Sequence, residues 1–201
     1  MLLLAFLFSS VVALSLLYPK VIGDSFGFLL MLPVIAYSAY FYVDWQFAFS
    51  LQLIAIILGG ICVGVGLLAA GLPMSSPQPR QFIINSFSGL KYLKRNRCYL
   101  LFQMGITLYE ECIWRVFLIS TLLLVLPDWG AICVSSVLFW TVHEENRPLG
   151  WHSLEFFLFA ILLGVAYALT HSVLFVWIVH LTRNALILSA SYYEQHEVGV
   201  G

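Results

Sequence analysis

The sequence predicts an all-α polytopic membrane protein, a helical bundle of about seven transmembrane helices. Three observations predict this class: 62% of the 201 residues are hydrophobic, only 9% are charged, and the mean hydropathy is +0.97. A soluble domain is about 45–50% apolar and about 25% charged, so a soluble fold of this composition could not cover its surface with polar groups. The net charge of -1 gives no basic field for nucleic acid. Soluble, disordered and nucleic-acid-binding classes are therefore excluded.

Three apolar runs in the first part of the chain are long enough to cross a bilayer, which takes about 20 residues as a helix. They cover residues 1–18, 25–43 and 47–72. Pro33 lies inside the second run, where neighbouring helices can satisfy the carbonyl that proline leaves unbonded. We therefore expect three spans before the composition changes.

The next segment, residues 73–97, differs in composition. It contains three prolines and five of the nine basic residues, so we expect a loop with an amphipathic stretch near its end. Four further apolar runs follow, and the second of them is short. They cover residues 100–126, 129–143, 150–169 and 172–193.

The basic residues predict the orientation, because cytoplasmic loops carry an excess of Lys and Arg. Residues 73–97 are therefore expected in the cytoplasm. Lys20 and Arg147 then also lie inside, and Asp44 and Asp128 lie outside. With seven spans, the amino terminus is outside and the carboxyl terminus inside, in a multi-pass protein of the cell membrane.

Charged residues inside the predicted spans need a physical reason, because a charge near the bilayer centre costs at least ~2.5–3.5 kcal/mol. Glu111 and Arg115 in the fourth span lie four residues apart with the acid first, so we expect them to pair. Glu110 lies about 100° around the helix and is the poorer partner for Arg115. A carboxylate without a cationic partner in a low dielectric is readily protonated near neutral pH, which suits a general base or acid. A Glu–Arg pair alone, however, more often serves helix packing.

Two more spans contribute polar residues. Phe139 and His143 end the fifth span, and His180 and Asn184 lie four residues apart on one face of the seventh. Two histidines, an asparagine and a glutamate on three helices can activate water and stabilise an oxyanion. We therefore expect these side chains to converge on one site.

Three motifs on three helices resemble those of the CPBP family, which includes Rce1-like CAAX prenyl proteases and Abi proteins. They are Glu110-Glu111-x-x-x-Arg115, Phe139-x-x-x-His143 and His180-x-x-x-Asn184. None of the motif positions is substituted, and the resemblance covers about residues 100–193. It implies a catalytic core at residues 99–193, preceded by transmembrane helices and a cytoplasmic loop (1–98) and followed by a cytoplasmic tail (194–201).

The resemblance implies an intramembrane endopeptidase of glutamate type that needs no cofactor. Glu110 takes a proton from a water held between it and His143, and this water attacks the scissile carbonyl. His180 and Asn184 donate hydrogen bonds to the oxyanion. The expected partners are the lipid bilayer and a membrane-associated peptide or protein substrate, and the site is expected to open towards the cytoplasm. The supporting residues are Glu111, Arg115 and Phe139.

Other activities use the same residue types. A zinc-dependent protease could bind its metal with Glu110, His143 and His180, although the chain lacks an H-E-x-x-H signature and its four cysteines have no C-x-x-C spacing. Buried acids and histidines also serve proton-coupled carriers, but carriers commonly have internal repeats and more spans. A non-catalytic immunity or scaffold protein is a further alternative, which the intact motifs disfavour.

Overall fold

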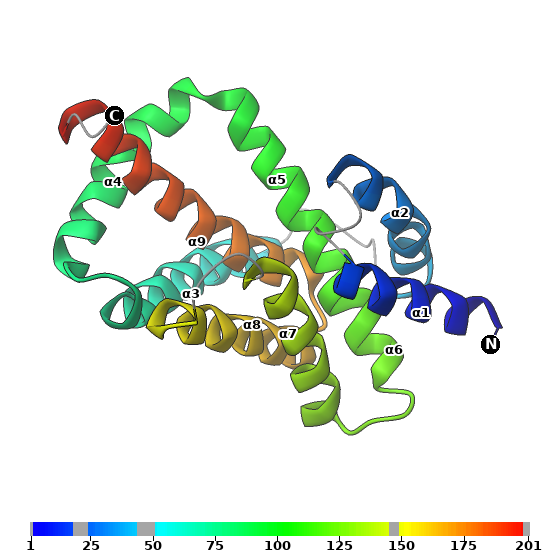
Figure 1. Ribbon diagram of the computed structural model, residues 1–201. Helices are drawn as coiled ribbons and strands as arrows, with labels where there is room; N and C mark the ends of the chain where they lie inside the picture. The colour runs from blue at the N-terminus through cyan, green and yellow to red at the C-terminus, as the bar shows by residue number, and fades with distance from the viewer. Residues whose placement is uncertain (1, 18–23, 44–50, 145–148, 199–201) are drawn as a thin grey trace. The chain divides into compact units, whose positions relative to one another are not determined.

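The computed structural model describes residues 2–17, 24–43, 51–144 and 149–198 (Figure 1). Every element of regular secondary structure in these ranges is a helix, which confirms the predicted all-α class. In chain order the elements are α1 (Leu2–Leu17), α2 (Asp24–Phe41), α3 (Leu51–Ser75), α4 (Pro79–Arg95), α5 (Arg97–Glu111), the π-helix η1 (Cys112–Ile119), α6 (Ser120–Leu122), α7 (Asp128–Glu144), α8 (Trp151–Thr170), α9 (Val173–Tyr193) and the π-helix η2 (Glu194–Val198).

Within the described ranges, three helices are long and apolar enough to cross a membrane: α3, α8, and α9 with its extension as Val173–Glu197. They correspond to the third, sixth and seventh predicted spans. Shorter apolar helices cover Leu2–Ser15 and Leu29–Phe41. These helices indicate a membrane protein, whereas the number of seven spans and the orientation stay predictions. Three of the residues used for the orientation lie outside the described ranges, namely Lys20, Asp44 and Arg147.

The segment predicted as a loop is mostly helical, so that prediction was wrong. Within residues 73–97, Pro73 lies near the end of α3, and α4 begins at Pro79. Proline suits the first position of a helix, because its fixed φ is helical and its missing N–H would have no acceptor there. The prolines therefore mark the end of one helix and the start of the next.

The chain forms two compact units. Unit 1 combines Met1–Phe47 with Tyr109–Val173, and unit 2 combines Ala48–Leu108 with Leu174–Gly201. The chain crosses from unit 2 to unit 1 within α5 and returns within α9. Both helices that carry candidate acids or amides therefore also carry a boundary between units.

In unit 1, the π-helix η1 is central to the packing. All eight of its residues are buried, and α2, α6, α7 and α8 contact it. Helices α7 and α8 lie side by side (Figure 1), and Gly164 of α8 permits this approach, because a Cβ there would lie 2.9 Å from the Ile132 Cγ2 atom. The Ser135 hydroxyl of α7 donates a hydrogen bond to the Trp114 carbonyl of η1. Contacts with two neighbours thus fix α7.

In unit 2, α3 and α9 approach closely at two glycines of α3. A Cβ on Gly60 would lie 2.8 Å from the Ile178 Cγ2 atom, and one on Gly64 would lie 2.7 Å from the Val179 carbonyl oxygen. Small residues let the backbones of membrane helices come this close. The glycines therefore fix α9 against α3 next to His180.

The turn between α8 and α9 depends on a non-glycine residue in the left-handed region. His171 has φ 49° and ψ 23°, and its N–H donates to the Tyr167 carbonyl at 2.7 Å. This conformation costs roughly 1–2 kcal/mol for a residue with a Cβ and is free of that strain in glycine.

We expect His171→Gly to raise the free energy of unfolding by about 0.5–1 kcal/mol. The variant loses the backbone strain, and this gain is larger than the cost of the greater conformational entropy of glycine in the unfolded chain. Thermal unfolding in detergent measures this change. The His171→Ala variant retains the strain and is expected to unfold at the wild-type midpoint. A glycine variant that unfolds at a lower temperature than the alanine variant would contradict the argument.

Candidate active site

The site residues predicted from the sequence divide between the two units. Their convergence on one site stays a prediction, but each group has a defined local geometry. Unit 1 holds Glu110 and Glu111 at the end of α5, Arg115 in η1, and Phe139 and His143 in α7, whereas unit 2 holds His180 and Asn184 in α9.

A carboxylate–imidazole pair joins the end of α5 to the end of α7. The Oε1 atom of Glu110 lies 3.4 Å from the Nε2 atom of His143. The two side chains are 19% and 32% exposed, respectively, so the pair can be reached from outside the packed interior. Glu110 therefore has the His143 imidazole as its neighbour.

Contacts within α7 fix the orientation of His143. Its Nδ1–H donates to the Phe139 carbonyl at 2.8 Å, since a carbonyl oxygen can only accept. In the neutral imidazole, Nε2 is then an acceptor, and it faces Glu110. The imidazole ring packs against Phe139 and Phe156, with ring centroids 4.4 Å and 5.3 Å away. The Glu110 carboxylate and the neutral Nε2 of His143 can therefore both accept hydrogen bonds from one water bound beside them.

The second carboxylate pairs with arginine, as the spacing predicts. The Nε atom of Arg115 lies 3.3 Å from the Oε2 atom of Glu111, and both side chains are fully buried. The guanidinium carbon also lies 4.2 Å from the centre of the Phe139 ring, which is within the range of a cation–π interaction. Arg115 thus connects Glu111 to the residue whose carbonyl orients His143.

One turn of α9 brings His180 and Asn184 into contact. The Nδ2 atom of Asn184 lies 3.2 Å from the Nε2 atom of His180, so the amide donates to the imidazole. His180 is buried. This bond places the proton of a neutral His180 on Nδ1. An amide carries two N–H groups, so Asn184 can also donate to a second acceptor.

The described residues of neither unit contain three His, Cys, Asp or Glu side chains close enough to hold a metal ion. The zinc site considered from the sequence takes Glu110 and His143 from unit 1 and His180 from unit 2. Unit 1 therefore provides two of its three protein ligands. The zinc-dependent alternative stays a prediction.

Two features of the site have no clear signal in the sequence. Phe156 of α8 packs against both His143 and Phe139, with ring centroids 5.3 and 5.4 Å away, yet it is one aromatic residue in a long apolar run. The second feature is the π-helical geometry of Cys112–Ile119. Such turns are rare, and they occur frequently at functional sites, but an apolar run that forms one reads like a buried α-helix.

These observations define an all-helical membrane protein with a glutamate–histidine pair in one unit and a histidine–asparagine pair in the other. Residues 97–186 match the family described as Type II CAAX prenyl endopeptidase Rce1-like. All seven candidate residues lie in the matched segment. The family is one of proteases, which indicates a hydrolase acting on a membrane-associated protein. No curated protein and no solved structure matches the chain.

Proposed function

We propose that the chain is an intramembrane endopeptidase that cleaves a membrane-associated substrate with a water activated by glutamate. The observation that carries this proposal is the 3.4 Å contact between Glu110 Oε1 and His143 Nε2. A carboxylate and an imidazole at this distance, reachable from outside, can together bind one water and remove its proton. The family match at residues 97–186 supports the same class of reaction.

The attacking water binds beside the pair, because 3.4 Å leaves no room for an oxygen atom on the line between the two atoms. One O–H donates to the Glu110 carboxylate and the other to Nε2 of His143, which directs an oxygen lone pair at the scissile carbonyl. Glu110 takes the first proton as the water oxygen bonds to the carbonyl carbon. When the C–N bond breaks, Glu110 returns this proton to the leaving amine and is again a carboxylate.

The oxyanion formed in this step needs hydrogen-bond donors, and we assign them to Asn184 and His180. Asn184 donates through the N–H that does not contact His180. The Nε2 atom of His180 accepts the other N–H of this amide and holds the amide in orientation, and the Nδ1–H of the neutral imidazole is the donor that His180 offers. One well-placed donor stabilises such a transition state by roughly 3–4 kcal/mol.

Glu111, Arg115 and Phe139 act as positioning residues. Arg115 contacts the Phe139 ring at 4.2 Å, and the Phe139 carbonyl accepts the Nδ1–H of His143. The buried ion pair of Glu111 and Arg115 thereby supports the helix segment that orients the imidazole, without contacting the water itself.

The protein is proposed to cross the cell membrane several times, with the site open to the cytoplasm. The five basic residues between positions 73 and 97 support this orientation. Glu110 follows the start of the fourth predicted span by ten residues, or about 15 Å along a helix. We take residues 99–193 as the catalytic core, because all the proposed catalytic side chains lie within them.

Cleavage by the purified chain in lipid vesicles tests this function. When a fraction of membrane proteins is incorporated into the same vesicles, mass spectrometry is expected to detect new peptide termini that accumulate with time. Exhaustive chelation is expected to leave this activity unchanged, whereas a loss that zinc restores would favour the zinc-dependent protease. Proton-coupled uptake by the vesicles without new termini would favour the carrier.

We expect Asn184→Ala to lower kcat by about 10²–10³, because the variant lacks one oxyanion donor. Initial rates of peptide release in vesicles measure the effect. Ser191→Ala changes an exposed side chain on the same helix and is expected to retain the wild-type rate. An Asn184 variant with unchanged kcat would remove this residue from the mechanism.

A further inference from the structure

Helix α4 begins close to the end of a candidate membrane span. That span, α3, ends at Ser75 and α4 starts at Pro79, and four residues of extended chain reach at most about 14 Å. The 17 residues of α4 include four cations and no acid. An amphipathic helix with basic residues is typical of segments that lie in the membrane interface.

One face of α4 is fixed to α9 and its extension. The Ser189 hydroxyl donates to the Ser86 carbonyl at 2.7 Å, and the Asn85 amide donates to the Glu194 carboxylate at 3.2 Å. A Cβ on Gly89 would lie 1.9 Å from the Ser189 carbonyl oxygen. Only glycine permits an approach this close, so this face of α4 cannot turn outward without breaking the contact.

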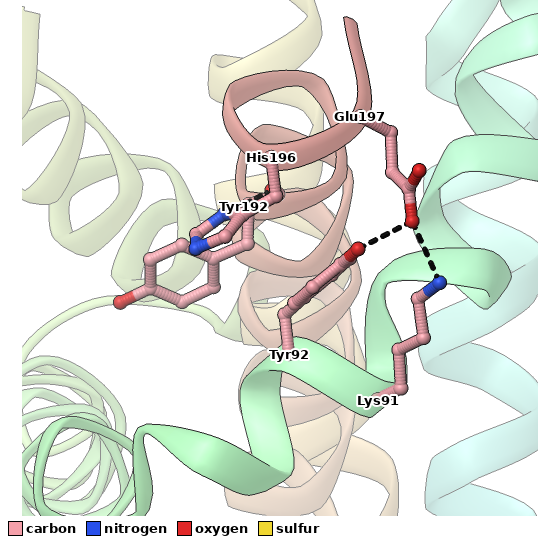
Figure 2. Close-up of polar contacts among 5 residues, drawn as sticks. All are labelled: Lys91, Tyr92, Tyr192, His196 and Glu197. Carbon is pink, nitrogen blue, oxygen red and sulfur yellow. Dashed lines mark hydrogen bonds and ion pairs between the residues drawn. The ribbon is translucent and has the colours of Figure 1, made fainter. Parts of the chain in front are cut away.

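A cluster around Tyr92 holds the C-terminal half of α4 in the same way (Figure 2). The Glu197 carboxylate accepts hydrogen bonds from the Lys91 ammonium, at 2.8 Å, and from the Tyr92 hydroxyl. The His196 ring stacks on the Tyr92 ring, with centroids 4.6 Å apart. The hydrogen bond to Glu197 raises the pKa of Lys91 above its usual value. These contacts fix the rotation of α4 about its own axis.

The opposite face of α4 carries an apolar ridge, formed by Ile84, Phe87 and Leu90. Their side chains are 47%, 52% and 43% exposed. Arg80 and Arg95 are exposed and lie before and after this ridge in the helix. Arg80 and Ile84 also line a hollow of about 340 Å³, which gives a headgroup room beside a cation. This face of α4 therefore has the apolar ridge in its middle and an arginine at each end.

We propose that α4 binds the bilayer surface, with the apolar ridge entering the acyl-chain boundary and Arg80 and Arg95 binding anionic phospholipid headgroups. A guanidinium group forms charge-assisted hydrogen bonds with phosphate oxygens. The apolar ridge lies beside the end of a membrane span, and so at the depth of the membrane interface. There its exposed side chains can move from water into the boundary between headgroups and acyl chains. A second copy of the chain is a poor occupant, because two α4 helices facing each other would bring their cations together without an acid between them.

Photocrosslinking in nanodiscs tests where the ridge lies. The full chain carries benzoylphenylalanine in place of Phe87 or, as the control, in place of Gln195, an exposed residue of η2. In nanodiscs of equal parts phosphatidylcholine and phosphatidylglycerol, we expect phospholipid adducts at position 87 and few at position 195. Equal adduct yields at the two positions would overturn the proposal. Covalent dimers at position 87 in place of lipid adducts would also overturn it and indicate contact between copies.

The same adducts test the role of the cations. At position 87 we expect phosphatidylglycerol to be favoured over phosphatidylcholine by about fivefold for each cation at the surface. The Arg80→Gln/Arg95→Gln variant, with the probe at position 87, is expected to lose this preference while keeping the adducts and the wild-type unfolding midpoint. A preference that persists in this variant would overturn the assignment of the headgroup contacts.

Discussion

Replacing Glu110 by glutamine is expected to abolish peptide release. The amide has the size of the carboxylate but cannot take a proton from water. A positioned general base contributes about 10²–10⁴ to the rate, so the loss is expected to be at least two orders of magnitude. Mass spectrometry of peptides released in vesicles measures it, with circular dichroism to show that the helices are retained.

Two matched variants separate the role of Glu110 from a general loss of charge. Asp128→Asn removes an exposed acid at the start of α7 and is expected to keep the wild-type rate. Glu111→Gln leaves Arg115 buried without its carboxylate, so any loss of activity there is expected to accompany a lower unfolding midpoint. Full activity of Glu110→Gln would refute its assignment as the base.

Replacing Arg115 by methionine is expected to have the largest effect on stability. The variant leaves the Glu111 carboxylate buried without its guanidinium partner, which lies 3.3 Å away in the wild type. Removing one member of a buried ion pair typically costs about 3–5 kcal/mol. Thermal unfolding in detergent measures the loss.

The double variant Glu111→Gln/Arg115→Met distinguishes a lost ion pair from lost packing. It contains no buried charge at these positions, so it is expected to be more stable than Arg115→Met alone. If the double variant were the less stable of the two, the destabilisation would come from the packing of Arg115 against Phe139 and not from the unpaired carboxylate.

The apolar runs predicted most helices well, because length and composition determine both a membrane span and a buried helix. The fifth run, predicted at 129–143, is α7 (Asp128–Glu144), and the sixth, predicted at 150–169, is α8 (Trp151–Thr170). Helix α4 was missed, because proline-rich, basic sequence is equally typical of a loop. In the structure, the face of α4 that carries Ser86 and Gly89 packs against Ser189 of α9.

Within the candidate site, the spacing of residues predicts contacts inside one helix, whereas it does not predict contacts between helices. The pairs Glu111–Arg115 and His180–Asn184 are four residues apart and are in contact. The contact between Glu110 and His143 joins α5 to α7, so no spacing within a single helix predicts it. Phe156 gave no signal, because an aromatic residue in an apolar run can face any direction.

The π-helix η1 sets which glutamate faces which neighbour. Hydrogen bonds from i to i+5 place more residues in each turn than an α-helix has, so each residue of η1 rotates the chain by less than the about 100° of an α-helix. Deleting Ile113, which lies between Glu111 and Arg115, would advance the preceding sequence by one place relative to Arg115. Glu110 would then occupy the place of Glu111, and Tyr109 would face the imidazole of α7. The number of residues between Glu111 and Arg115 therefore matters to the site in the same way as the identity of the acids before them.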